Sequence, residues 1–200
     1  QIVPDYLRHR VAPPEERLSG LGRRDFLKLA GAATVALAAA PAWAQSAKVE
    51  VQWLGQSATK LTSLTGKVIV IDPFLTQNPK TPAAHKNLDA LGKVDAILVT
   101  HGHGDHTGDV AELAKRTGAK VYGPAGLIAT MTDLGWVPPD QGVRFAKGGR
   151  INPLGPQITI TQVRAEHSSE VTVSDPTTKK TTTYPGGEPC GFVIEFENGF

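Results

Sequence analysis

Short apolar runs alternate with polar segments through most of the chain, and glycine or proline marks many of the boundaries. Residues 94–100 form a nearly continuous apolar run of strand length, which is typical of a strand buried on both faces. Apolar residues recur at helical spacing over residues 109–117, and Gly118 follows as a helix C-cap. A second helix is predicted over residues 125–134, stopped by Gly135.

Runs rich in β-branched and aromatic residues predict the strands. Val49–Leu54 and Lys67–Ile71 are separated by glycine and polar residues, so we expect a hairpin or meander to open the domain. The order of these strands and the two helices predicts a mixed α/β fold in which helices flank layers of sheet. Further strands are predicted over residues 120–122, 143–146, 158–163 and 191–196, with a polar stretch at 174–189 between the last two.

The first 44 residues have a different pattern, that of an export signal. Arg23 and Arg24 precede an apolar run over residues 29–40, which ends in an Ala-Trp-Ala sequence at Ala44. The run is shorter than the ~18 apolar residues that a membrane-spanning helix needs. It also lacks the polar face of an amphipathic helix, which is the alternative interpretation. The paired arginines resemble a twin-arginine signal, although Gly22 stands where Ser or Thr is usual.

We therefore expect residues 1–44 to be a signal peptide cleaved after Ala44, and residues 45–200 to be the mature domain. The precursor would use the twin-arginine export machinery, and the mature protein would be periplasmic or exported without a stable membrane span. The first 44 residues hold six Lys/Arg against four acids, whereas the remainder holds fifteen of each. Because the net charge of +2 belongs to the N-terminal segment, we expect no nucleic-acid partner. Cys190, the only cysteine, excludes a disulfide framework within the chain and is interpreted as a small core residue.

The candidate chemistry lies in the sequence His-Gly-His-Gly-Asp-His, which directly follows the apolar run at 94–100. Three imidazoles and a carboxylate are the ligands of a zinc-like ion, and the end of a strand is where α/β folds place their active sites. Four residues so close in sequence cannot easily all coordinate one ion. We therefore expect two ions that share the loop, with distant residues as the remaining ligands of each. The alternative is a solvated, histidine-rich loop without metal. The candidate ligands here are His101, His103, Asp105 and His106.

Three other residues are candidates for a part in this site or near it. His167 follows the predicted strand at 158–163 and is the best distant ligand, although it is also compatible with an exposed loop histidine. Asp72 ends an apolar run, where it either supports a metal ligand from behind or forms a turn before Pro73. His85 has no neighbouring ligands and is interpreted as a surface residue.

The motif after a buried strand, together with the Val-Ile-Val-Ile-Asp-Pro run that precedes it, resembles the metallo-β-lactamase superfamily. Over residues 48–200 the chain is similar to small metal-dependent hydrolases related to the L-ascorbate-6-phosphate lactonases. The segments that carry this resemblance are 53–57, 71–74, 100–108, 167–169 and 187–192. The resemblance implies an αββα sandwich of two similar halves, of which the second is incomplete in this chain.

The resemblance also implies roles for the ligands. His101, His103 and His167 match the first metal site, and Asp105 and His106 match the second. A bridging Asp and a final His are expected beyond Phe200, so we expect these 200 residues to be inactive alone. In the full-length protein, two divalent ions would bridge and activate a water molecule. Zinc is expected, with manganese or iron as alternatives.

The expected function is therefore that of an exported binuclear hydrolase that attacks an ester, lactone, amide or phosphodiester bond with a metal-activated hydroxide. Asp105 is also the candidate catalytic residue, because it can orient the hydroxide or move a proton. The alternative is a non-hydrolytic metal-binding or redox member of the same fold. Redox members resemble His-x-Glu-x-Asp-His, so His103 favours hydrolysis. The substrate is expected to be a small molecule, and an anionic one is compatible with Lys179 and Lys180. These lysines would contact it if the stretch at 174–189 covers the cleft. The alternative is that this stretch forms a solvated hairpin.

Overall fold

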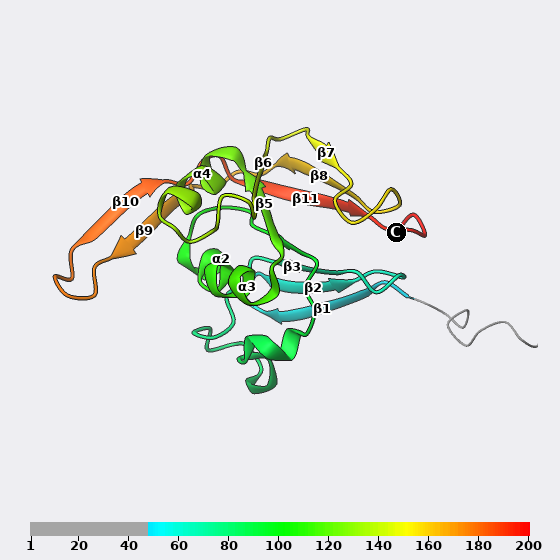
Figure 1. Ribbon diagram of the computed structural model, residues 1–200, viewed down its shortest axis with the longest axis horizontal. Helices are drawn as coiled ribbons and strands as arrows, with labels where there is room; N and C mark the ends of the chain where they lie inside the picture. The colour runs from blue at the N-terminus through cyan, green and yellow to red at the C-terminus, as the bar shows by residue number, and fades with distance from the viewer. Residues whose placement is uncertain (1–47) are drawn as a thin grey trace, which may run out of the picture. The chain divides into compact units, whose positions relative to one another are not determined.

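A six-stranded sheet forms one layer of the protein, whose computed structural model describes residues 48–200 (Figure 1). Its first three strands pair antiparallel, and strands β3 to β6 pair parallel in sequence order. The predicted opening meander is confirmed, although its middle strand was not predicted. The predicted signal peptide lies outside the described residues. The strands are β1 (Glu50–Gly55), β2 (Ala58–Thr62), β3 (Val68–Ile71), β4 (Ala96–Leu98), β5 (Lys120–Pro124) and β6 (Gly142–Phe145).

Helices cover one face of this sheet. The predicted helices are present as α3 (Val110–Thr117) and α4 (Ala125–Asp133), and Gly118 ends α3 in the left-handed conformation with φ of 69°. A buried cluster that includes Ile97 and Val121 of the sheet and Leu113 and Leu127 of the helices fills this layer. The short helix α2 (Gly104–Thr107) and the 3₁₀ helices η4 (Ala83–His85) and η5 (Leu88–Leu91) complete the helical elements among the described residues.

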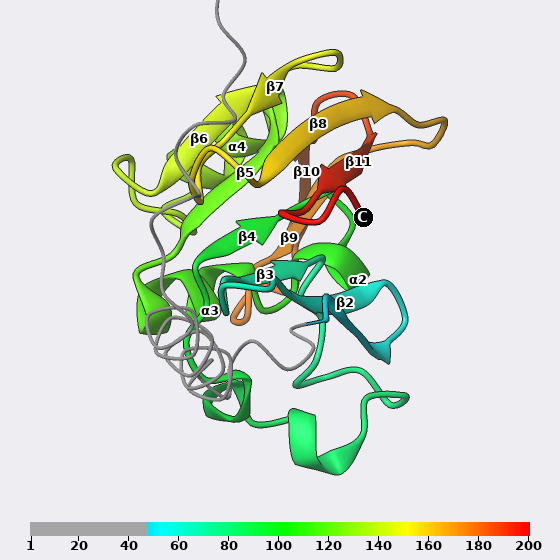
Figure 2. The same ribbon diagram turned by 90° about the vertical axis from the view of Figure 1, so that its right-hand side faces the viewer.

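A second, three-stranded sheet lies against the other face. It contains β7 (Arg150–Ile151), β8 (Thr159–Arg164) and β11 (Cys190–Glu195) in the antiparallel order β11-β8-β7. In Figure 2, β8 and β11 lie on one side of β4 while α3 lies on the other. A second buried cluster, with Ile69 and Leu98 from the first sheet and Ile160 from the second, fills the space between the sheets. The described residues thus form a helix layer and two sheet layers.

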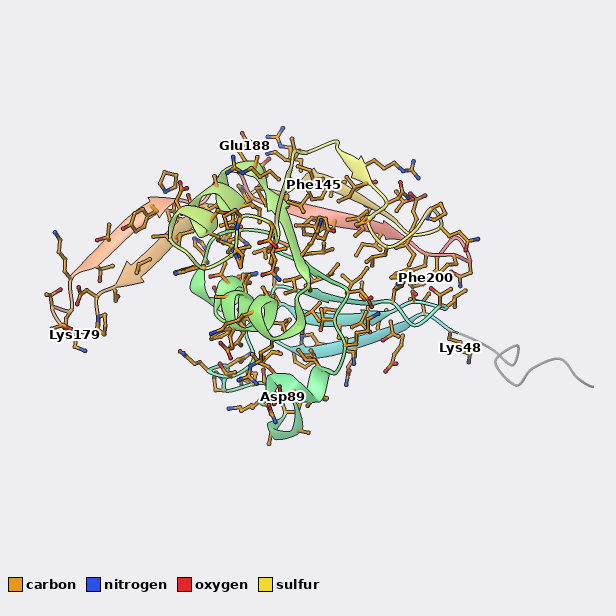
Figure 3. All side chains as sticks on the ribbon, in the orientation of Figure 1. Lys48, Asp89, Phe145, Lys179, Glu188 and Phe200 are labelled. Carbon is orange, nitrogen blue, oxygen red and sulfur yellow. The ribbon has the colours of Figure 1, made fainter. Side chains whose placement is uncertain are left out.

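Residues 174–185 of the polar stretch at 174–189 belong to a surface hairpin formed by β9 (Glu170–Ser174) and β10 (Thr181–Pro185). Lys179 lies in the turn at the tip of this hairpin (Figure 3). The structure therefore favours the solvated hairpin over the interpretation of this stretch as a cover for the cleft. Neither strand was predicted from the sequence. For β10 the reason is that four of its five positions are exposed, so it carries no core-facing pattern. Within the described residues, no helix is long and apolar enough to cross a bilayer.

Candidate metal centre

The histidine-rich loop begins where the most buried strand of the first sheet ends. All three residues of β4 are fully buried, and the loop runs from Thr100 into α2. His167 lies in the connection between β8 and β9, so the second sheet brings it to the same place from the other side. Gly102 packs so closely on β9 that a Cβ there would lie 2.9 Å from the carbonyl oxygen of Glu170. Both sheets therefore contribute residues to one site.

His101, His103 and His167 form a cluster whose candidate ligand atoms all lie within 4.8 Å of one another. Nε2 of His101 lies 3.2 Å from Nδ1 of His103. Two nitrogens bound tetrahedrally to one zinc ion, each at about 2.0–2.1 Å, lie roughly 3.3–3.4 Å apart. The two imidazoles therefore already have the spacing of ligands that share a metal ion. The residues present fit the ion that the sequence predicts.

His101 is held in the form that can bind metal. Its Nδ1 lies 2.9 Å from the hydroxyl oxygen of Thr100, and that hydroxyl donates a 2.7 Å hydrogen bond to Oδ2 of Asp72. This chain places the ring hydrogen on Nδ1 and leaves the lone pair of Nε2 free toward His103. Burial, reinforced by the nearby rings of His106 and His103, lowers the pKa of His101 to about 4. The imidazole is therefore neutral at pH 7, as a metal ligand must be.

His103 turns Nδ1 toward the site, whereas His101 turns Nε2 toward it. Its Nδ1 faces His101, whereas its Nε2 lies 3.0 Å from Oε2 of Glu170 and 3.3 Å from the hydroxyl of Ser168. The hydrogen bond with His103 holds the pKa of Glu170 below its usual value. Glu170 was not among the residues singled out from the sequence, because it lies in an exposed polar stretch without a recognisable spacing.

Asp105 and His106 lie next to the three histidines and form a second group. The ring centroids of His101 and His106 are 3.9 Å apart, and Nε2 of His106 lies 3.8 Å from Oδ2 of Asp105. Nδ1 of His106 is 2.8 Å from Oδ2 of Asp72. Although burial acts to lower it, the hydrogen bond and charge of Asp72 raise the pKa of His106 overall. Asp72 thus supports the histidines from behind, which was one of the two interpretations of this residue.

The turn between β1 and β2 supplies two contacts that the sequence did not reveal. Gln56, with a positive φ of 54°, donates a 2.9 Å hydrogen bond from Nε2 to Oδ2 of Asp105. The hydroxyl of Ser57 lies 3.3 Å from Nε2 of His106. His85 lies outside the cluster, half-buried in η4, with Nε2 3.1 Å from Nε2 of Gln52. Cys190 is buried, as expected of a core residue.

A histidine-rich loop at the end of a buried strand, in a fold of two packed sheets with helices on the outer face of the first, is typical of a metallo-β-lactamase type of protein. Residues 67–200 match the family model of the beta-lactamase superfamily domain, and the chain belongs to this superfamily. It is 54% identical over 162 residues to a UPF0173 metal-dependent hydrolase of Cupriavidus taiwanensis, covering 80% of this chain and 57% of that protein. A UPF0173 metal-dependent hydrolase of Thermodesulfovibrio yellowstonii is 40% identical over 153 residues, covering 75% and 56%. The chain thus spans a little over half the length of these relatives.

Solved structures confirm the predicted fold class. Igni18, a metallo hydrolase from the archaeon Ignicoccus hospitalis, aligns with a TM-score of 0.57 and 29% identity over 74% of this chain and 56% of its own. A metallo-beta-lactamase from Cronobacter sakazakii with a HARLDQ motif aligns with a TM-score of 0.50 and 19% identity, covering 74% and 58%. At that low identity, the second alignment bears on the fold alone.

Proposed function

We propose that the protein is a metal-dependent hydrolase with two divalent ions, zinc in the first instance. The observation that carries this proposal is the 3.2 Å separation between Nε2 of His101 and Nδ1 of His103, with His167 beside them. These three residues would hold the first ion, and Asp105 with His106 would begin the second site. Two ligands are fewer than the four that zinc takes, so the second site needs water or residues outside the described range.

The chemistry of such a pair of ions is the activation of water near neutral pH and the polarisation of the bond to be cleaved. The protein's own residues would set the geometry. Asp72 holds His106 directly and His101 through Thr100, while Gln56 holds the carboxylate of Asp105. Asp105 is 44% exposed in its side chain and is therefore accessible to a substrate. We assign to it the orientation of the attacking water, as well as metal binding.

The names of three similar proteins support the hydrolytic assignment. The two bacterial relatives are described as metal-dependent hydrolases, and the archaeal protein is described as a metallo hydrolase. Ester, lactone, amide and phosphodiester bonds all fit this chemistry. A cleft of about 480 Å³ beside His167 is the candidate entrance for the substrate. Lys147 and Arg164 line it, and Lys147 forms a 2.7 Å ion pair with Glu188. Arg164 is likewise paired with Glu166 in the same cleft, so an anionic substrate would have to compete with two carboxylates for these cations.

We also infer from the sequence that the precursor is exported by the twin-arginine machinery and that the mature protein is periplasmic. The paired Arg23 and Arg24 before the apolar run at 29–40 support this inference. Replacing both arginines by lysine tests it, because the export receptor is expected to distinguish the arginine pair from lysines. Accumulation of the uncleaved precursor in the cytoplasm is the expected result, and undiminished export would contradict it.

The test of the hydrolase is a comparison of metal content and activity in the purified full-length protein that contains this chain. We expect stoichiometric zinc by elemental analysis, and metal-restored hydrolysis of at least one of four substrates: an aryl ester, a lactone, a β-lactam and bis-p-nitrophenyl phosphate. His101→Ala should lose bound metal, whereas His85→Ala should keep it, because His85 lies outside the cluster. Equal metal content in the two variants would contradict the ligand assignment. Stoichiometric metal without hydrolysis of any of the four substrates would favour a non-hydrolytic role.

A further inference from the structure

His101 and His103 turn different nitrogens toward the space that they share. His101 presents Nε2 and His103 presents Nδ1. A neutral imidazole carries its hydrogen on one nitrogen and its lone pair on the other, and the partner of the remote nitrogen decides which form is present. The two rings therefore need opposite tautomers, and each needs its own support on the far side.

The support for His101 is the chain through Thr100 to Asp72 that is described above. Asp72 cannot serve His103, because its recorded side-chain partners are Thr100 and His106. On the remote side of His103, the only charged partner among the described residues is Glu170, 3.0 Å from Nε2. Ser168, at 3.3 Å, is an uncharged second contact that can donate or accept.

Glu170 is held in position by the base of the β9–β10 hairpin. The hydroxyl of Ser169 accepts a 3.1 Å hydrogen bond from the backbone N–H of Gly102 and donates a 2.8 Å bond to the carbonyl oxygen of Gly186. The N–H of Gly186 in turn donates to the carbonyl oxygen of Ser169 at 2.9 Å. One residue therefore joins both strands of the hairpin to the loop between His101 and His103. The carboxylate that follows it is thereby fixed beside His103.

From this arrangement we propose that Glu170 is the positioning residue for His103. It accepts a hydrogen bond from Nε2–H and so keeps the lone pair of Nδ1 directed at the metal position. A histidine that binds metal through one nitrogen commonly donates the other N–H to a carboxylate, and removing that carboxylate typically weakens metal binding about 10–100-fold. The proposal rests on the proposed metal site, and it gives the hairpin a role at its base rather than at its tip.

The test compares Glu170→Ala with Glu195→Ala in the purified protein. Glu195 is a matched control, because its side chain is 51% exposed against 49% for Glu170. Its carboxylate also accepts a hydrogen bond from a nitrogen-bearing side chain, that of Arg150 at 2.6 Å. Zinc affinity is measured by competition with a chromophoric chelator. We expect Glu170→Ala to bind zinc about 10–100-fold more weakly than the wild type, Glu170→Gln to be intermediate, and Glu195→Ala to match the wild type within about twofold.

A second measurement reports on the tautomer without any metal. Without a metal, the 3.2 Å contact with Nε2 of His101 favours a hydrogen on Nδ1 of His103, whereas the contact with Glu170 favours one on Nε2. In ¹⁵N-histidine spectra of the metal-free protein, Glu170→Ala should therefore increase the fraction of His103 that carries its hydrogen on Nδ1. An unchanged tautomer together with unchanged zinc affinity in Glu170→Ala would overturn the proposal. Absence of zinc binding in the wild type would instead contradict the proposed function. A merely structural role would lower the melting temperature of Glu170→Ala without changing the tautomer, and that result also overturns the proposal.

Discussion

Asp72 and His106 are joined by a 2.8 Å hydrogen bond between Oδ2 and Nδ1. Asp72 is buried, with 2% of its surface exposed, and its backbone has a positive φ of 47°. The same carboxylate accepts hydrogen bonds from the N–H of Thr100 at 2.8 Å and from its hydroxyl at 2.7 Å. A single buried carboxylate thus fixes the strand end and the ring of one candidate ligand. It also reaches His101 through Thr100.

The first prediction follows from this shared role. Asp72→Asn keeps the size of the side chain and tolerates the left-handed backbone, but it removes the charge and one of the acceptor oxygens. We expect a loss of about 1–3 kcal/mol in the free energy of unfolding, because buried donors of Thr100 and His106 lose a partner. Asp72→Ala should lose about 1 kcal/mol more from backbone strain in the left-handed region. Urea denaturation measures both losses.

Exposed Asp133→Asn at the end of α4 is the control for the Asp72 variants. It makes the same chemical change outside the core, and its free energy of unfolding should stay within about 0.5 kcal/mol of the wild type. If Asp72→Asn were as stable as Asp133→Asn, the carboxylate would not have the structural role described here.

The second prediction concerns the core between the two sheets. Ile160 is fully buried there, whereas Val193 on the neighbouring strand β11 faces outward and is 50% exposed. Ile160→Ala should lower the free energy of unfolding by about 2–5 kcal/mol, because it removes buried methyl groups and leaves a cavity. Val193→Ala should change it by less than about 1 kcal/mol. Similar losses in the two variants would contradict the position of this core.

The third prediction concerns alkaline pH. Burial, with a further contribution from the charge of Asp72, raises the pKa of the Cys190 thiol from 9.0 to about 12. As the pH rises above 9, the unfolded chain loses the thiol proton while the folded protein keeps it, so the folded state becomes less favoured. This loss amounts to at most about 1.4 kcal/mol per pH unit between pH 9 and 12. Below pH 9 the thiol should not affect the pH dependence.

Cys190→Ala isolates this effect from the lysines and tyrosines that titrate in the same range. As the pH rises from 8 to 10, the free energy of unfolding of the wild type should fall relative to that of Cys190→Ala. At pH 8, the native thiol should react slowly with Ellman's reagent and rapidly once urea unfolds the chain. A difference that is constant with pH would show that the native thiol ionises normally.

The sequence predicted the parts of the site that have a motif, and missed the parts that depend on packing. His101 and His103 follow a fully apolar strand, so their position at a sheet edge could be inferred, and His167 repeats that arrangement. Gln56 and Glu170 reach the site only because a tight turn and a hairpin base come close to it, 49 and 67 residues away along the chain from their partners. The local sequence of either segment does not indicate that it lies close to the histidine loop in space.

The same limit applies to the secondary structure. The buried strand β4 and the helices α3 and α4 have a strong apolar pattern and were predicted, with boundaries that differ by a few residues. The strand β7 has two residues, and β10 is largely exposed, so their pairing is decided by neighbouring strands rather than by their own composition. Short or exposed strands are therefore found only when the partner strand is known.

The last prediction separates two glycines that look alike in the sequence His-Gly-His-Gly-Asp-His. A Cβ on Gly102 would lie 2.9 Å from the carbonyl oxygen of Glu170 and 3.0 Å from Cγ2 of Val171, whereas a Cβ on Gly104 would meet nothing within 4 Å. Gly102→Ala must push β9 away from the loop between His101 and His103. We expect it to cost about 1–3 kcal/mol in free energy of unfolding and to weaken zinc binding, because Glu170 moves with β9.

Gly104→Ala, at the start of α2, should be neutral or stabilising by up to about 1 kcal/mol, since alanine is the better helix former. Urea denaturation and chelator competition on the two variants give the comparison, and equal effects would contradict the close packing of the hairpin base on the histidine loop.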